Sequence, residues 1–201
     1  MDSKDELMLK IAGVIGIVTP IATFTLILLA ISSVPQFSWT ENALSDLGVE
    51  SGITAMVFNV ALIACGLLLL IFASGLNMLL QKTVLGKIGA FVFAIDFLAL
   101  TTIGVFPENI KPATLHYYVS VAFFALFPLS MFFITVGFLR TAKMKLGLFT
   151  LLAALVAVAI WVVQFTLHLF SNVAIPETVA ALSASAWVIV LGSSMLKEAS
   201  H

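Results

Sequence analysis

The chain has 201 residues, of which 62% are hydrophobic and only 9% are charged, and its formal net charge is −1. A soluble domain carries about 25% charged residues, so this composition excludes an ordinary water-soluble fold, whose surface would here be largely apolar. The near-neutral charge also gives no indication of nucleic-acid binding. The composition predicts an integral membrane protein, with the lipid bilayer as its first partner, because lipid tails solvate Leu, Val and Phe side chains.

Apolar runs of spanning length recur along the whole chain. One helical span needs about 20 apolar residues, so a chain of this length holds roughly six. We therefore predict an all-α fold, a single six-helix transmembrane domain over residues 1–201. In chain order, the predicted spans are 7–32, 53–80, 85–106, 113–139, 146–169 and 176–196. Pro20 and Pro128 lie inside the first and fourth spans, and each is expected to kink its helix.

The N-terminal apolar run is interpreted as a retained helix rather than a signal peptide. It is longer than a usual signal-peptide core, and the residues before it are of mixed charge instead of basic.

The basic residues separate the two sides of the predicted bundle. With six spans, one side receives Lys4, Lys10, Lys82, Lys87, Arg140, Lys143, Lys145 and Lys197. Only Lys111 lies on the other side. The positive-inside rule therefore predicts a multi-pass protein of the cell membrane with both termini in the cytoplasm.

The outer side of this arrangement carries most of the polar side chains that could bind a ligand or take part in catalysis. They include Asn42, Ser45, Asp46, Glu108, His116, His168 and Glu177. Exclusion of acids from the basic side would account for the carboxylates, but it does not account for the two histidines. We expect Asp46, Glu108 and His116 to converge around one cavity, with Asn42 and Ser45 completing the hydrogen bonding. A carboxylate near the lipid boundary is better placed against a donor or water than against acyl chains.

Asp96 lies near the middle of the predicted third span. A charged carboxylate at that depth costs about 2.5–3.5 kcal/mol on insertion scales, so it should face the interior of the bundle. One interpretation is a proton, ion or ligand site. The other is a structural hydrogen bond to Asn59, Gln164 or a hydroxyl such as that of Thr101.

Further polar residues share helix faces with the two histidines or lie in the outer halves of their helices. Gln164 and His168 are four residues apart and share one helix face, as do His116 and Ser120. With Asn59, they would line a cavity that opens to the outer side. The same residues would serve equally well as hydrogen-bonding contacts between helices.

A metal site is a further possibility on the outer side. His116, His168, Asp46, Glu108 and Glu177 combine imidazole and carboxylate, which suit zinc, manganese or iron. However, the chain has no HxxxH or HExxH spacing, so the sequence signal for a metal site is weak. The signal for a haem held between the two histidines is weaker still. No cofactor is identified from the sequence.

The outer loops contain two recognisable blocks of residues. The first is Ser38-Trp39, then residues 42–48 (NALSDLG), then Phe58-Asn59. The second is residues 104–108 (GVFPE), followed by His116 and Phe123-Phe124. Over roughly the first two thirds of the chain, these blocks resemble a prokaryotic multi-pass membrane family catalogued as domain of unknown function 998. The resemblance implies six spans and a membrane location, and it implies no established reaction.

Three functions compete, and the sequence leaves open whether the protein is an enzyme. We favour a binding protein whose outer-facing pocket holds a lipid or small amphiphile, since apolar walls with a few polar groups suit such a ligand. One alternative is a membrane-embedded hydrolase, with or without a metal, that uses Asp46, Glu108 or His116 on a lipid at the outer interface. Another is a proton-coupled transporter that uses Asp96, although no broken helices recur in matching halves. The candidate pocket residues are Asn42, Ser45, Asp46, Asn59, Asp96, Glu108, His116, Gln164 and His168.

Overall fold

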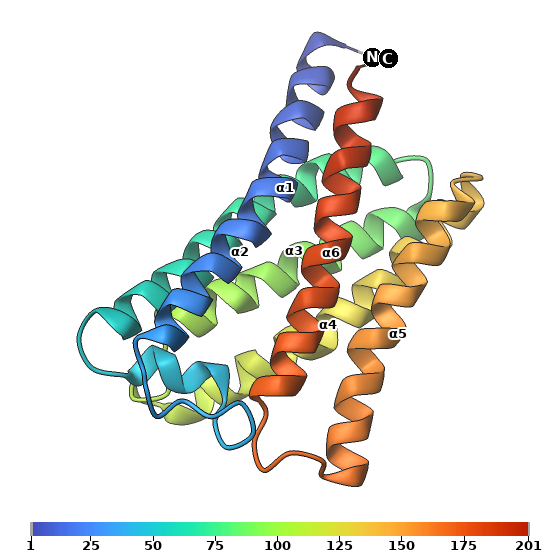
Figure 1. Ribbon diagram of the computed structural model, residues 1–201. Coiled ribbons are helices and arrows are strands. Elements are labelled where there is room, and N and C mark those ends of the chain that lie inside the picture. The colour runs from blue at the N-terminus through green and yellow to red at the C-terminus, as the bar shows by residue number, and fades with distance from the viewer. Residues whose placement is uncertain (1, 201) are drawn as a thin grey trace.

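The computed structural model describes residues 2–200 and consists of six long helices and one short 3-10 helix (Figure 1). They are α1 (Ser3–Ser32), η1 (Leu44–Val49), α2 (Ile53–Leu80), α3 (Val84–Val105), α4 (Ala113–Arg140), α5 (Met144–Leu167) and α6 (Ala174–Glu198). All six α-helices are long and apolar enough to cross a membrane, and residues 2–200 contain no strand. The predicted all-α fold with six helices able to span a membrane is therefore confirmed.

Several helix boundaries differ from the predicted spans by a few residues, and two of these differences have evident local reasons. α5 ends at Leu167, two residues early, because His168 adopts a left-handed conformation with φ 47°. This conformation stops a helix and is common just after its last turn. α6 begins at Ala174, before Pro176. A proline is tolerated there because amide groups in the first helical turn have no partner within the helix.

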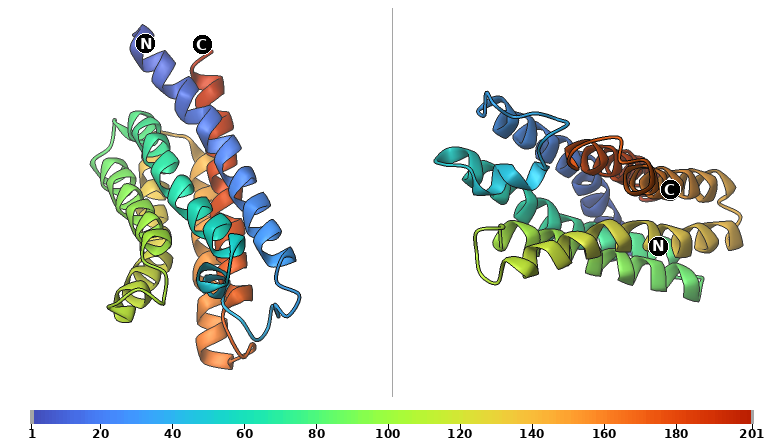
Figure 2. Two further views of the ribbon diagram at one scale, coloured as in Figure 1. Left: turned by 90° about the vertical axis from the view of Figure 1, so that its left-hand side faces the viewer. Right: turned by 90° about the horizontal axis from the view of Figure 1, so that it is seen from below.

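The six helices form a closed ring. Each packs mainly against its neighbours in the chain, α6 packs back against α1, and helices on opposite sides of the ring touch little. The N-terminal end of α1 and the C-terminal end of α6 lie near each other at one end of the bundle (Figures 1 and 2). We call this end, with the connections 81–83 and 141–143, the terminal end. The opposite end, with the connections 33–52, 106–112 and 168–173, is the motif end.

Glycines allow α1 and α6 to close the ring. A Cβ atom built on Gly192 would lie 2.7 Å from the carbonyl oxygen of Gly13, and one built on Gly13 would lie 2.8 Å from that of Gly192. No side chain fits at such a crossing, so the two backbones approach each other directly.

Large aromatic side chains fill the ring towards the terminal end. Phe93 packs against Phe72, Phe97 and Trp187, with ring centroids 5.7, 4.5 and 5.5 Å away. The indole nitrogen of Trp187 donates a hydrogen bond to Thr150 Oγ1 at 2.9 Å, so this buried polar atom is paired. Aromatic side chains thus occupy this half of the ring, and the cavity described below lies towards the motif end.

Candidate functional site

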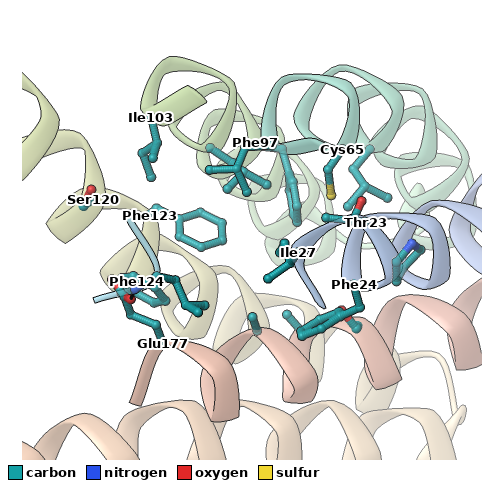
Figure 3. Close-up of a pocket in the computed structure, with 18 of the residues that line it drawn as sticks. Thr23, Phe24, Ile27, Cys65, Phe97, Ile103, Ser120, Phe123, Phe124 and Glu177 are labelled. Atoms are coloured by element: carbon teal, nitrogen blue, oxygen red, sulfur yellow. Dashed lines mark hydrogen bonds between the residues drawn. The ribbon is translucent and has the colours of Figure 1, made fainter. Parts of the chain in front are cut away.

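A cavity of about 100 Å³ lies inside the ring, between the aromatic cluster and the motif end (Figure 3). Its walls come from α1, η1, α2, α3, α4 and α6, and most lining side chains are apolar. The residues contributed by α2 are Phe58, Leu62, Cys65 and Leu69, which recur at helical spacing. α2 thus presents one apolar face to the cavity. The close-up shows Glu177 and Ser120 at one end of the cavity and Cys65 and Thr23 at the other.

Glu177 is the only charged residue among those that line the cavity. It lies in the first turn of α6, where the helix dipole favours a carboxylate, and its side chain is only 9% exposed. Its Oε2 accepts a 2.7 Å hydrogen bond from the backbone amide of Leu44, 133 residues away in the chain. Among residues 2–200, its Oε1 has no hydrogen-bond partner.

The connection 33–52, which we call the motif loop, lines this end of the cavity through Leu44 and Ser45 and is held by its own side chains. Asn42 accepts a hydrogen bond from the Ser38 amide at 2.9 Å and donates one to Asp46 Oδ2 at 2.7 Å. The same Asp46 oxygen accepts the Ala43 amide at 3.1 Å. Asn59, on α2, donates to the carbonyl of Gly48 at 2.9 Å. These polar groups therefore set the shape of the loop, as side chains of this type do in turns.

The motif loop is also joined to the connection between α5 and α6. The amide of Asn172 donates to the carbonyl of Thr40, and the amide of Ala174 donates to that of Asn42, both at 2.9 Å. Gln164 is buried near the end of α5 and donates to the carbonyl of Phe170 at 2.9 Å. Its amide thus closes the α5–α6 connection. The motif loop, which lines the cavity through Leu44 and Ser45, is therefore held in place by the α5–α6 connection.

Glu108 links the α3–α4 connection, residues 106–112, to the motif loop. Its Oε1 accepts a 2.8 Å hydrogen bond from the hydroxyl of Ser45 and lies 3.6 Å from Nε2 of His116. His116 Nδ1 lies 2.9 Å from the carbonyl oxygen of Phe106. A carbonyl can only accept, so Nδ1 carries a proton. Nε2 is buried and has no hydrogen-bond partner within the described chain.

The structure separates the predicted pocket residues into distinct groups. Ser45 lines the cavity. Glu108 accepts a hydrogen bond from Ser45, and His116 lies beside Glu108, so these two residues are next to the cavity without lining it. The side chains of Asn42, Asp46, Asn59 and Gln164 instead hold the loops. His168 is exposed at the end of α5, outside the cavity lining.

Asp96 is fully buried in α3, and neither of its carboxylate oxygens has a hydrogen-bond partner in the described part of the chain. The predicted structural bond to Asn59, Gln164 or Thr101 is wrong. Thr101 donates instead to the Phe97 carbonyl of its own helix. This intrahelical bond satisfies the hydroxyl locally, so Thr101 does not need the carboxylate. Asp96 does not line the cavity.

The metal hypothesis gains no support from the geometry. Across residues 2–200, no three His, Cys, Asp or Glu side chains form a group that could hold a metal ion. Three protein ligands are the usual minimum for a catalytic metal centre.

Sequence reasoning missed Glu177 as a pocket residue, although it counted Glu177 among the outer acids. The signal was present in the spacing. Glu177, Ala181, Ala184, Ser185 and Val188 all line the cavity and recur at intervals of one to four residues along one helix face. Small side chains on one face of a helix leave space next to that face, and here Glu177 lies at the N-terminal end of such a face.

Comparison with known proteins identifies one family. Residues 17–194 match the family described as "Protein of unknown function (DUF998)". Neither the curated proteins nor the solved structures gave a match.

Proposed function

The chain belongs to this family of unknown function, and from the geometry of the cavity we propose that it is a multi-pass membrane protein that binds a lipid or small amphiphile. The ligand places its apolar part in the cavity inside the ring and its polar part under the motif loop. In this arrangement the motif end faces outwards and both termini lie in the cytoplasm, since the basic residues gather at the terminal end.

The observation that carries this proposal is an apolar cavity with its charged group at one end. A water molecule needs about 10–15 Å³ of such space, so a cavity of about 100 Å³ is several times larger. Its Phe, Leu and Ile side chains offer water few partners, and apolar cavities of this kind take up apolar molecules. Glu177 and Ser45 supply polar contacts at the motif end. Binding sites for small molecules have this composition, with apolar walls and a few polar groups that orient the ligand.

Binding is favoured over hydrolysis by the contacts of Ser45 and His116. Nucleophilic catalysis of the serine type needs the hydroxyl hydrogen-bonded to a histidine. Here the Ser45 hydroxyl donates to Glu108, and His116 Nε2 faces the same carboxylate. Binding is favoured over proton-coupled transport because Asp96 lies outside the cavity lining.

Photochemical labelling tests the proposal. The protein in phosphatidylcholine nanodiscs is irradiated with a dodecanol probe that carries a diazirine on its chain, and the labelled residues are mapped by mass spectrometry. We expect saturable labelling of residues that line the cavity, such as Phe24, Phe97 and Phe123. Ala184→Phe fills the cavity with a ring and should abolish this labelling.

Ala159→Phe is the matched control, because Ala159 is exposed on α5 and does not line the cavity. It should leave the labelling of the cavity unchanged. Labelling that is restricted to lipid-facing residues, or that persists in Ala184→Phe, would contradict the proposed binding site.

A further inference from the structure

We propose that the amphiphile bound in the cavity has a positively charged head group, an alkylammonium, which pairs with Glu177. This inference rests on the proposed binding function and names the chemical class of its ligand. Three independent features of the motif end support it.

The first feature is an unpaired carboxylate oxygen in an apolar cavity. Glu177 is 9% exposed, and Leu44 satisfies only its Oε2. No Lys, Arg or His is among the residues that line the cavity. A buried charge needs a partner of opposite charge or a full set of hydrogen bonds. The free Oε1 has neither, so a cationic ligand head supplies what the protein lacks.

The second feature is a gathering of carboxylates around one short segment. Three consecutive residues of the motif loop each donate to a different acid: the Ala43 amide to Asp46, the Leu44 amide to Glu177, and the Ser45 hydroxyl to Glu108. Consecutive residues are at most about 3.8 Å apart at their Cα atoms. The three carboxylates therefore lie around one end of the cavity, where a phosphate or carboxylate head would be repelled.

The third feature is the lack of basic side chains at this end. Lys111 is the only Lys or Arg in the three connections of the motif end, and it is exposed. In the described chain, the Lys–carboxylate ion pairs are Lys10 with Glu6 and Lys143 with Glu198, and all four residues lie at the terminal end. His116 is buried beside Glu108, but it does not line the cavity, and its Nε2 makes no hydrogen bond within the described residues.

Aromatic rings add a means of holding a quaternary ammonium. Phe123 and Phe124 line the cavity together with Glu177, and their ring centroids are 5.0 Å apart. The faces of aromatic rings attract organic cations, most strongly where water is excluded. The apolar remainder of the cavity then receives the alkyl chain, which runs from Glu177 towards Cys65 (Figure 3).

A competition experiment tests the charge of the head group. The diazirine dodecanol probe is displaced from the protein in phosphatidylcholine nanodiscs by dodecyltrimethylammonium, dodecanol or dodecyl sulfate, each below its micellar concentration. We expect the ammonium compound to displace the probe at about a tenfold lower concentration than dodecanol, as one charge-assisted contact implies. Dodecyl sulfate should be the weakest competitor.

Glu177→Gln removes the charge and keeps an oxygen that can accept the Leu44 amide. The ratio between the ammonium compound and dodecanol should then fall to about one, since the tenfold preference comes from the charge. Glu41→Gln is the matched control, because Glu41 lies at the same end, is hydrogen-bonded to Ser171 and does not line the cavity. It should keep the preference.

The outcomes separate the two proposals. Equal displacement by all three compounds, stronger displacement by the sulfate, or an unchanged preference in Glu177→Gln would overturn the cationic head group and leave the binding function standing. Failure of every amphiphile to displace the probe would overturn the binding function itself.

Discussion

At the scale of single residues, two buried carboxylates have contrasting surroundings. Glu177 lines a cavity and is held by a backbone amide, whereas Asp96 is fully enclosed and both of its oxygens lack partners. An unpaired buried polar group costs stability, because folding removes its hydrogen bonds to water without replacing them. Ionisable residues inside membrane helices are costly, and this cost marks Asp96 as a candidate functional position.

Substitution of Asp96 by an apolar residue should therefore stabilise the protein. We expect Asp96→Val to be more stable than Asp96→Asn by about 1–3 kcal/mol, since the amide stays unpaired and valine does not. Thermal unfolding of the purified protein measures this difference. Thr150→Val is the control with the opposite sign, because Thr150 accepts a hydrogen bond from Trp187 and its loss should destabilise. If Asp96→Asn were the more stable variant, the carboxylate would have a hydrogen-bonding role after all.

At the scale of helices, the crossing of α1 and α6 determines whether the cavity exists. These two helices are the first and last of the ring, and their contact closes it. Gly13 and Gly192 permit that contact because neither has a side chain, and each would place a Cβ atom within 2.8 Å of the other's carbonyl oxygen. Cavity formation thus depends on residues that do not line the cavity.

Gly192→Val should open this crossing. Its side chain must displace the α1 backbone, and we expect a loss of about 1–3 kcal/mol in unfolding free energy, as for other overpacked sites. Ala186→Val is the matched control, since Ala186 is exposed on the same helix. The dodecanol labelling of cavity residues should fall in Gly192→Val alone. Equal stability and labelling in the two variants would show that the crossing is not required.

At the scale of the whole molecule, the ring places different chemistry at its two ends. The terminal end carries most of the Lys and Arg residues, and the motif end carries the motif loop and the Glu177 carboxylate that line the cavity. The positive-inside rule predicts that the motif end lies outside the cell. We therefore expect the proposed ligand to reach the protein from the outer leaflet or the outer aqueous phase.

Accessibility of single cysteines tests the orientation. In a Cys65→Ala background, Ser51→Cys and Asn109→Cys should react with an impermeant maleimide added to intact cells, because both positions are exposed at the motif end. Gln81→Cys and Met144→Cys are exposed at the terminal end and should react only after the membrane is permeabilised. The reverse pattern would place the motif end on the cytoplasmic side and contradict the proposed orientation.

The helices could be predicted from the sequence because their cause is local. In lipid, each backbone polar group must be satisfied within its own segment, so an apolar run of about 20 residues forms a helix whatever lies around it. The start of α2 and its end at Leu80 agree with the predicted span, and the early stop at His168 is a single-residue effect.

The cavity and its charged group were decided by tertiary structure. Leu44 and Glu177 are 133 residues apart, and Ser45 and Glu108 are 63 apart, so no local pattern states that they meet. The sequence by itself determined six membrane helices and the gathering of acids and histidines in the connections of one side. Only the closing of the ring decided that Glu177 faces the cavity while Asp46 and Gln164 hold the loops. The physical reason is that helix formation depends on neighbours in the chain, whereas the direction of a side chain within a bundle depends on which helices pack against its own.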